Sequence, residues 1–118
     1  MRIKTPAKIN LTMDVLNKRP DGFHNIQSVM QMIDLYDYLT LEVIDINGGI
    51  KINLTGTSDE IPYNEKNLVH KAAKLFFEHT QIDSKQVNIH IEKNIPISAG
   101  LAGGSTNAAG TLYGLNKY

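Results

Sequence analysis

Apolar and polar residues alternate along much of the first half of the chain, which is the period-two pattern of half-buried β-strands. After an interruption at Pro6, the alternation runs through residues 9–15. It returns in residues 28–33 and 38–46, with a polar region at 34–37 between them. The pattern therefore predicts three strands, with the polar region separating the second from the third.

Turn sequences separate these strands and introduce a fourth. Residues 17–24 contain Pro-Asp-Gly, in which proline presets one backbone dihedral and glycine accepts the left-handed one. Asn-Gly-Gly at 47–49 is typical of a hairpin turn and leads into an alternating segment at 50–54. Residues 55–65 have the composition of a loop. We therefore expect an antiparallel meander.

The hydrophobic period changes from two to about 3.6 residues after this loop. Between Asn67 and Thr80, the apolar residues at three- and four-residue spacing are Leu68, Ala72, Leu75 and Phe76. A strand at 87–91 follows this amphipathic helix, and a second helix is predicted over 105–115. Strands, helix, strand and helix in this order predict an α+β fold.

Composition limits the classes of protein to consider. The 118 residues are 42% hydrophobic and 20% charged, which is typical of one soluble globular domain. Twelve basic and twelve acidic residues cancel, so the bulk charge favours neither nucleic acid nor a membrane as a partner. The chain has no cysteine, which excludes disulfides and thiolate catalysis and favours the cytoplasm. No apolar run reaches the ~18 residues of a membrane helix.

The segment PISAGLAGGSTNAAGTL, residues 96–112, is the candidate for chemistry. It places Gly100, Gly103 and Gly104 between a strand and a helix, and Ser105 and Thr106 follow. Glycines allow the backbone to approach an anion, and the free amides of a helix amino terminus attract one without net basic charge. Phosphate is the expected ligand, with the hydroxyl groups available to phosphate oxygens or magnesium.

The loop differs from the common nucleotide-binding motifs. GxxxxGK[ST] requires a lysine where Gly104 stands, and the spacing is not GxGxxG. The alternative is that the glycines only end a strand and cap a helix. Three glycines in five residues, followed by two hydroxyl groups and small residues, favour an anion site over that alternative.

The loop resembles that of the GHMP kinase superfamily, P-x-x-x-G-L-[GA]-[GS]-S, which binds the phosphates of ATP; here it reads PISAGLAGGS. PAKINL near the amino terminus and DGFH at 21–24 resemble the branch that phosphorylates a cytidine-diphosphate sugar alcohol in non-mevalonate isoprenoid biosynthesis. NLVHKAA and IEKNIPISAGLAGGSTNAA follow in the family's order, so the resemblance covers essentially the whole chain. It implies ATP-dependent phosphorylation of a hydroxyl group of that sugar alcohol, with Mg²⁺ accompanying ATP.

The resemblance also implies roles for individual residues. Lys8 of PAKINL is the catalytic residue, because a cation at the reacting centre lowers the cost of charge that gathers during transfer. Asn10 contacts the methylerythritol moiety, Phe23 stacks on cytosine and His24 hydrogen-bonds to it. Phe23 stands where tyrosine is commoner in the family; it keeps the stacking face and loses the phenol group.

The remaining implied contacts are to the nucleotide. Adenine-side contacts fall on Asn67, Lys93 and Asn107, and the loop surrounds the phosphates. The full ATP-side set is Asn67, Lys93, Pro96, Gly100, Leu101, Ala102, Gly103, Gly104, Ser105, Thr106 and Asn107. Ser105 is also the expected contact to the magnesium of Mg–ATP. Asn67 could instead serve only as a helix cap, and Lys93 as a surface lysine.

The fold implied by the resemblance is a ribosomal S5 domain 2-like two-layer sandwich with a mostly antiparallel sheet. Residues 1–118 correspond to part of the family's amino-terminal, ATP-binding domain. The catalytic aspartate and the carboxy-terminal domain of the family have no counterpart in these residues. We therefore expect no phosphoryl transfer by the chain alone, and self-association through apolar surface that the missing part would cover.

Other functions fit parts of the sequence. Another GHMP kinase, of the mevalonate or homoserine type, would give the DGFH loop no affinity for cytidine. A non-catalytic nucleotide-binding remnant would bind ATP without turnover. RNA binding on a ribosomal-protein-like fold is disfavoured by zero net charge and the absence of a basic stripe.

Overall fold

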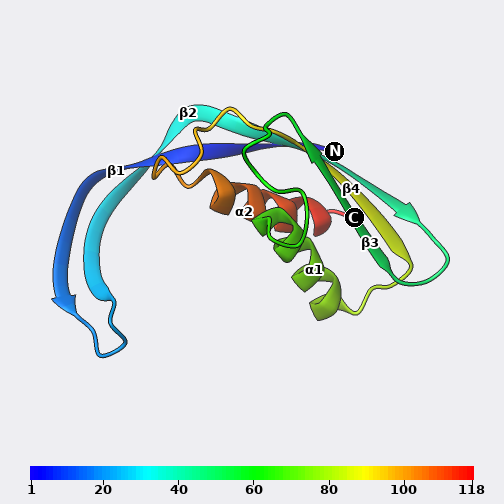
Figure 1. Ribbon diagram of the computed structural model, residues 1–118, viewed down its shortest axis with the longest axis horizontal. Coiled ribbons are helices and arrows are strands. Elements are labelled where there is room, and N and C mark those ends of the chain that lie inside the picture. Colours follow the sequence, from blue (N-terminus) through cyan, green and yellow to red (C-terminus); the bar gives the residue numbers. More distant parts are fainter.

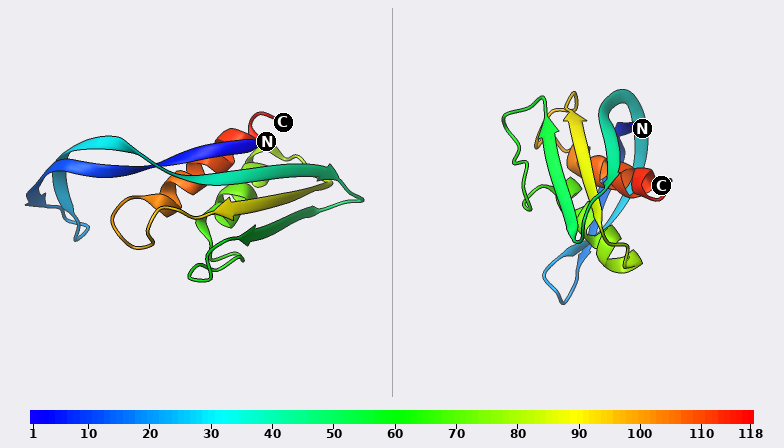
Figure 2. Two further views of the ribbon diagram at one scale, coloured as in Figure 1. Left: turned by 90° about the horizontal axis from the view of Figure 1, so that it is seen from above. Right: turned by 90° about the vertical axis from the view of Figure 1, so that its right-hand side faces the viewer.

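A mixed four-stranded sheet carries both helices on one of its faces (Figures 1 and 2). The computed structural model describes all 118 residues. The elements are β1 Arg2–Lys18, β2 His24–Asp45, β3 Ile50–Gly56, α1 Leu68–Thr80, β4 Lys85–Glu92 and α2 Gly103–Leu115. The strand order is β1-β2-β4-β3, with antiparallel pairing except between β3 and β4. The predicted fold class, a two-layer α+β sandwich with a mostly antiparallel sheet, is confirmed.

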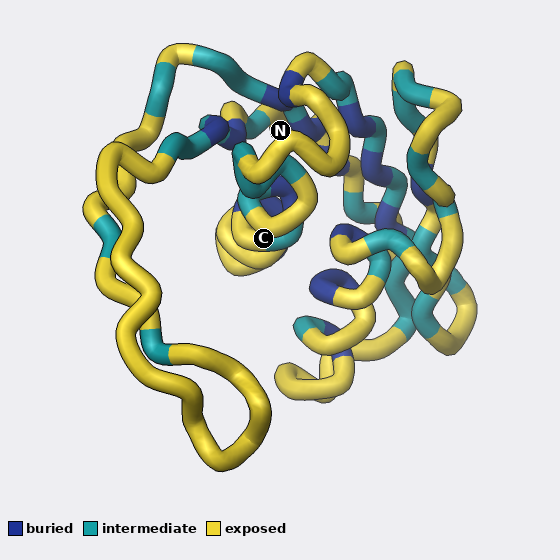
Figure 3. The backbone as a smooth tube through the Cα atoms, turned by 60° about the vertical axis from the view of Figure 1, so that its left-hand side comes forward, coloured by how far each residue is buried: buried dark blue, intermediate teal, exposed yellow.

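The hairpin of β1 and β2 extends past the helices and bends (Figure 1). Its outer half is exposed along nearly all of its length (Figure 3). The predicted strand start after Pro6 is wrong, because β1 begins at Arg2. Pro6 instead lies at an irregularity in the pairing with β2, between Pro6 and Lys8. This position suits proline, which has no backbone N–H to give to a regular ladder.

The predicted separation of two strands at 34–37 is also wrong, because β2 continues through these residues without a break. Asp37 pairs with Thr5 of β1, and both side chains are buried. The polar Asp37 predicts an interruption of the strand, whereas in the structure its carboxylate has hydrogen-bond partners in the interior. Those partners belong to the functional site described below.

The predicted meander is wrong at β3. Gly48 and Gly49 turn the chain at positive φ, 83° and 74°, as the sequence suggested. However, β3 does not return along β2. It pairs in parallel with β4, which lies between them, and Leu54 stands opposite Ile89. The segment that joins β3 to β4 contains α1 and so supplies the crossover that a parallel pair needs.

Helix α1 ends at the predicted residue but turns a different face to the sheet. Its buried residues are Val69, Ala72, Ala73 and Phe77. Leu68 and Leu75 of the predicted face are 44% and 62% exposed. Both sets satisfy helical spacing, and a shift of one residue rotates the stripe by about 100°. Periodicity alone could not choose between two overlapping apolar faces.

Helix α2 begins at Gly103, two residues before the predicted start. It lies close to β1 because glycines face the sheet. A Cβ on Gly110 would stand 2.5 Å from Cγ2 of Thr5, and one on Gly114 would stand 2.5 Å from Cδ1 of Ile3. The core between the layers is formed by Leu39, Leu41, Leu54, Val69, Ala73, Phe77, Val87, Ile89, Ile91 and Leu115. Neither helix has the length and apolarity needed to cross a bilayer.

Candidate functional site

A cavity of about 370 Å³ opens where the glycine-rich loop meets the first turn of α2 and the segment leading into α1. Its volume lies within the roughly 300–1,000 Å³ of small-molecule sites. Residues of the predicted ATP-side set that line it are Asn67, Lys93, Pro96, Gly100, Leu101, Ala102, Gly103, Gly104, Ser105 and Asn107. Thr106 of that set is not in the wall. The other lining residues are Ile61, Pro62, Lys66, Leu68, Ile97, Ser98 and Ala99. The wall contains no carboxylate, and Lys66 adds an exposed cation to it, which suits an anion.

The loop between β4 and α2 has an unusual backbone. Every second residue of its central part has positive φ: Ser98 at 59°, Gly100 at 72° and Ala102 at 59°. Only glycine adopts this region without cost, so the other two residues each store on the order of 1 kcal/mol of strain. Strain of this kind persists only where surrounding contacts fix the backbone, and it occurs often at binding sites.

The amino terminus of α2 faces the cavity without a cap. Ala102 occupies the N-cap position, and no side chain accepts a hydrogen bond there. The amide of Thr106 donates to the carbonyl of Ala102, 2.9 Å. The preceding amides of Gly103, Gly104 and Ser105 have no intrahelical acceptor by the geometry of a helix start. No acidic residue lies in this first turn, so the partial positive charge of the helix end remains for a ligand.

Lys8 is held against the loop by two hydrogen bonds. Its backbone amide donates to the carbonyl of Leu101, 3.0 Å. Its ammonium group donates to the carbonyl of Gly100, 2.9 Å. The predicted catalytic lysine is therefore brought to the glycine-rich loop from another strand, although it is not part of the cavity wall.

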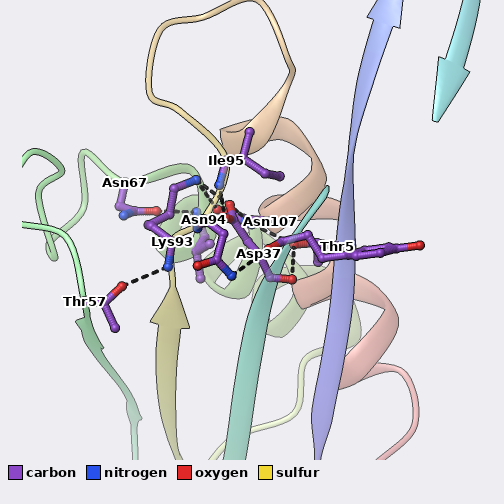
Figure 4. Close-up of polar contacts among 10 residues, drawn as sticks. Thr5, Asp37, Thr57, Asn67, Lys93, Asn94, Ile95 and Asn107 are labelled. Carbon is purple, nitrogen blue, oxygen red and sulfur yellow. Dashed lines mark hydrogen bonds and ion pairs between the residues drawn. The ribbon is translucent and has the colours of Figure 1, made fainter. Parts of the chain in front are cut away.

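A buried carboxylate beneath the cavity joins four segments of the chain (Figure 4). Asp37 has 0% exposure, and its Oδ1 accepts from the amides of Asn94, 2.6 Å, and Ile95, 2.8 Å. Its Oδ2 accepts from Nζ of Lys93, 2.5 Å, and from Nδ2 of Asn107, 3.0 Å. Asn107 Nδ2 also donates to the hydroxyl of Thr5, 2.9 Å. Each oxygen of this carboxylate thus accepts two hydrogen bonds.

Three residues predicted to contact adenine already have protein partners. The Lys93 side chain is 7% exposed and paired with Asp37. Asn107 is 3% exposed and bonded within the same network. Asn67 caps α1, because its Oδ1 accepts from the amide of Val69, 2.9 Å. All three line the cavity, and their contacts to a nucleotide remain predictions.

The predicted substrate residues lie on the long hairpin, outside the cavity wall. Asn10 is exposed, and its Oδ1 accepts from the hydroxyl of Ser28, 3.0 Å. Phe23 lies in the turn at the end of the hairpin with 70% exposure, and His24 follows at the start of β2. The structure thus gathers Lys8 and the ATP-side residues and leaves the cytidine-side residues apart from them.

Sequence reasoning missed three residues of this region. Asp37 and Thr5 form the buried network, and Lys66 lines the cavity with an exposed side chain. An Asp and a Thr that face each other on paired strands form no recognisable sequence motif. The available signal for Asp37 was an acidic residue inside an otherwise strand-like segment, which calls for a buried partner.

No group of three or more His, Asp or Glu side chains in the structure could hold a metal ion. The expected Mg²⁺ must therefore be tested against another donor set. Ser105 offers one exposed hydroxyl beside the free helix amides. A single hydroxyl fits Mg²⁺ that arrives on ATP, since magnesium takes its other ligands from phosphates and water.

Comparison with known proteins shows which family the later part of the chain resembles. Residues 67–118, from α1 through the glycine-rich loop and α2, match the GHMP kinases N terminal domain. Over these residues the chain is similar to that family.

Curated relatives named 4-diphosphocytidyl-2-C-methyl-D-erythritol kinase match along almost the whole chain. The one from Caldicellulosiruptor saccharolyticus is 52% identical over 99% of this chain and 39% of its own length. The one from Clostridioides difficile is 50% identical over 98% of this chain and 38% of its own length. The chain thus spans about two fifths of the length of these relatives.

Solved structures of kinases are also similar to the chain along almost its whole length. A crystal structure of 4-(cytidine 5'-diphospho)-2C-methyl-D-erythritol kinase has a TM-score of 0.82 and 34% identity, covering 99% of this chain and 40% of that one. Homoserine kinase from Cytophaga hutchinsonii has a TM-score of 0.67 at 22% identity, with 98% and 34% covered. The second likeness shows the fold alone.

Proposed function

We propose that the chain binds ATP in the cavity beside α2 and contributes to transfer of the γ-phosphoryl group to a hydroxyl of 4-diphosphocytidyl-2-C-methyl-D-erythritol. One observation carries the proposal: the uncapped amides of α2 open into a cavity whose wall contains the exposed Lys66 and no carboxylate. The names of the relatives supply the reaction and the acceptor. Transfer of this activity to the chain belongs to the proposal, since the relatives are longer.

In the proposed reaction, the hydroxyl oxygen of the substrate bonds to the γ-phosphorus while the bond from that phosphorus to the bridging oxygen breaks, leaving ADP. Gly103, Gly104 and Ser105 direct amides toward the phosphates, and these dipoles need no reorganisation as charge shifts. Lys8 places a cation beside the loop, where it stabilises the charge between the incoming hydroxyl and the transferring group. The family resemblance assigns acceptance of the hydroxyl proton to an aspartate outside residues 1–118.

Mg²⁺ would enter with ATP and neutralise charge on the β- and γ-phosphates. Ser105 is the residue that would contact it. Phe23 and His24 would hold the cytosine from the end of the hairpin, which requires the substrate to reach from there to the loop. The cytoplasm is the proposed location of the activity, in keeping with a chain that has no cysteine.

Backbone amide shifts test the nucleotide site directly. Addition of Mg–ATP to the ¹⁵N-labelled chain should move the resonances of Gly103 and Gly104. Those of Gly48 and Gly49, in a turn outside the cavity wall, serve as internal controls. A folded chain whose loop resonances stay unchanged with ATP in large excess would contradict the proposal.

Turnover and acceptor identity need a complete enzyme. Residues 1–118 can replace the matching segment of the Clostridioides difficile relative, and the chimaera can be assayed for ADP release. We expect activity with the cytidine substrate and none with mevalonate or homoserine. Binding of ATP without turnover by a folded chimaera would favour a non-catalytic role.

Self-association is a further proposal. Large apolar side chains that are more than half exposed on the β1–β2 hairpin are Leu11, Val15, Leu16, Phe23, Ile26, Val29, Met30 and Met32. Such a surface is costly to leave in water. Light scattering should report a mass above that of one chain, and a monomeric mass would refute the proposal.

A further inference from the structure

We infer that Asp37 is a positioning residue for the glycine-rich loop: its buried carboxylate fixes the residues before the loop and the helix after it at one point, so that the α2 amides are aimed at the phosphates. This inference rests on the proposed function and adds a residue to the site. Asp37 has no exposure and lines no part of the cavity. It therefore acts through other groups and contacts no ligand.

The first oxygen of the carboxylate holds the segment that enters the loop. Oδ1 accepts from two successive backbone amides, of Asn94 and Ile95. Asn94 adds a third hydrogen bond to β2, because its Nδ2 donates to the carbonyl of Tyr36, 2.9 Å. The chain therefore leaves β4 in a fixed direction, and the loop starts from a defined point.

The second oxygen holds the helix that leaves the loop. Oδ2 accepts from Asn107, which lies on the second turn of α2, and from Lys93. Nζ of Lys93 also donates to Oδ1 of Asn107, 3.1 Å. The ammonium group thus bridges both ends of the loop and shares the carboxylate with the helix.

The ammonium group of Lys93 also sets the position of the first residue of the helix. A Cβ on Gly103 would stand 3.1 Å from Nζ of Lys93 and 3.1 Å from Cγ2 of Ile95. The start of α2 therefore rests directly on two residues that Asp37 holds. Displacement of Lys93 or Ile95 would move Gly103, whose amide faces the cavity.

The network uses more polar groups than packing alone requires. Buried ion pairs can often be replaced by apolar side chains without loss of stability, because removing two charges from water is expensive. Here, apolar side chains would remove the cost of burying two charges, but they could not hold the loop in place. Apolar residues could fill the space, but the amides of Asn94 and Ile95 and the Asn107 side chain would lose their shared acceptor.

This difference provides the main experiment, a pair of substitutions made together, Asp37→Leu with Lys93→Met. The pair removes both charges and leaves neither unpaired. We expect a folded variant with a lower melting temperature, because the amides of Asn94 and Ile95 lose their acceptor, and with faster hydrogen exchange at the loop amides in the absence of ATP. The exchange rate decides here, because Lys93 also belongs to the predicted ATP-side set. A folded double variant whose loop amides exchange as slowly as those of the wild type would overturn the inference.

Asp37→Asn is the second variant and covers the case in which the double variant does not fold. Asparagine keeps one acceptor oxygen for Asn94 and Ile95, but its NH₂ group faces the donors of Lys93 and Asn107. Asp34→Asn is the matched control, since Asp34 is an exposed carboxylate on the same strand. We expect the control to leave ATP affinity and loop exchange unchanged.

Exchanging the carboxylate and the amide between positions 37 and 107 gives a rescue test. Asp37→Asn combined with Asn107→Asp returns one carboxylate and one amide to the same two sites, so that Lys93 keeps a charged partner. We expect this variant to recover most of the ATP affinity that Asp37→Asn loses. Equal weakness in the single and the exchanged variants would count against the positioning role.

Kinetics separate positioning from general loss of structure. In the chimaera with the Clostridioides difficile relative, Asp37→Asn should raise KM for ATP and leave KM for the cytidine substrate unchanged. Equal changes in both constants would overturn the inference. If the wild-type chain binds no ATP, the proposed function fails. Loop exchange in Asp37→Asn against Asp34→Asn then still decides whether Asp37 holds the loop.

Discussion

Gly110 on α2 lies so close to Thr5 on β1 that no side chain fits between them: a Cβ built on the glycine would stand 2.5 Å from Cγ2 of the threonine. Both residues are buried, and the Thr5 hydroxyl is fixed by its hydrogen bonds to Asn107 and the carbonyl of Asp37. The methyl group therefore cannot rotate away without breaking these bonds.

We predict that Gly110→Ala lowers the free energy of unfolding. Overpacking costs about 1–3 kcal/mol and outweighs the roughly 1 kcal/mol that alanine gains over glycine in a helix. Chemical denaturation measures the net effect. Ala109→Gly, on the exposed side of the same turn, measures the helix-propensity effect separately.

Thr5→Ser provides the matched compensation, because serine keeps the hydroxyl and lacks Cγ2. In a double-mutant cycle, Gly110→Ala should cost less in the Thr5→Ser background than in the wild type. Additive effects would show that contact between these two residues is not the cause.

Ala102→Gly should stabilise the folded chain. Ala102 has φ of 59° at the start of α2, and glycine relieves that strain by about 1 kcal/mol, less the entropy that glycine loses on folding. The expected net change is a small rise in melting temperature. Ala99→Gly, which relieves no such strain, should lower it, and a fall for both variants would contradict this explanation.

Lys8→Met should reduce phosphoryl transfer in the chimaera by about 100-fold or more, the size typical of losing one electrostatic contact to a transition state. Folding should change little, because Nζ of Lys8 makes one hydrogen bond at the surface, to Gly100. Circular dichroism and ADP release together check this result. Lys4→Met is the control, on the same strand with an exposed side chain, and equal loss of activity in both variants would exclude a specific role for Lys8.

Phe23→Ala should weaken binding of the cytidine substrate by about tenfold, since aromatic stacking on a base contributes about 1–3 kcal/mol. Stability should remain within about 0.5 kcal/mol of the wild type, because Phe23 is 70% exposed. Calorimetry with the cytidine substrate measures the affinity. Leu16→Ala, at 55% exposure on the same hairpin, should leave it unchanged.

Local patterns in the sequence were sufficient for most elements. α1 ends at Thr80 as predicted, and β4 contains the alternating residues 87–91. These elements were predictable because capping and periodicity act between neighbours. The glycine-rich loop was predictable for the same reason, and its residues form the wall of the cavity.

The strand pairing of β3 and the buried network of Asp37 could not be predicted, because both depend on contacts between residues far apart in the sequence. The parallel pairing of β3 with β4 cannot be predicted from the local sequence. Asn-Gly-Gly is equally compatible with a hairpin to β2 and with a turn that leads to another strand. The pattern places Asp37 in a polar region between two strands, because its partners lie 56 and 70 positions further along the chain. The sequence predicts that Lys93 contacts the nucleotide or lies at the surface, whereas in the structure its charge is paired with Asp37.

The long sequence separations within the Asp37 network also constrain how the chain acquires its structure during synthesis. Asp37 leaves the ribosome well before Lys93 and Asn107, so its carboxylate must stay hydrated until those residues arrive. Thr5 and Asn107, 102 positions apart, can come together only after Asn107 has emerged. The loop backbone can therefore be fixed by this network only after both sides of the loop have been made, and recovery of its shape after dilution from denaturant should report assembly of the network.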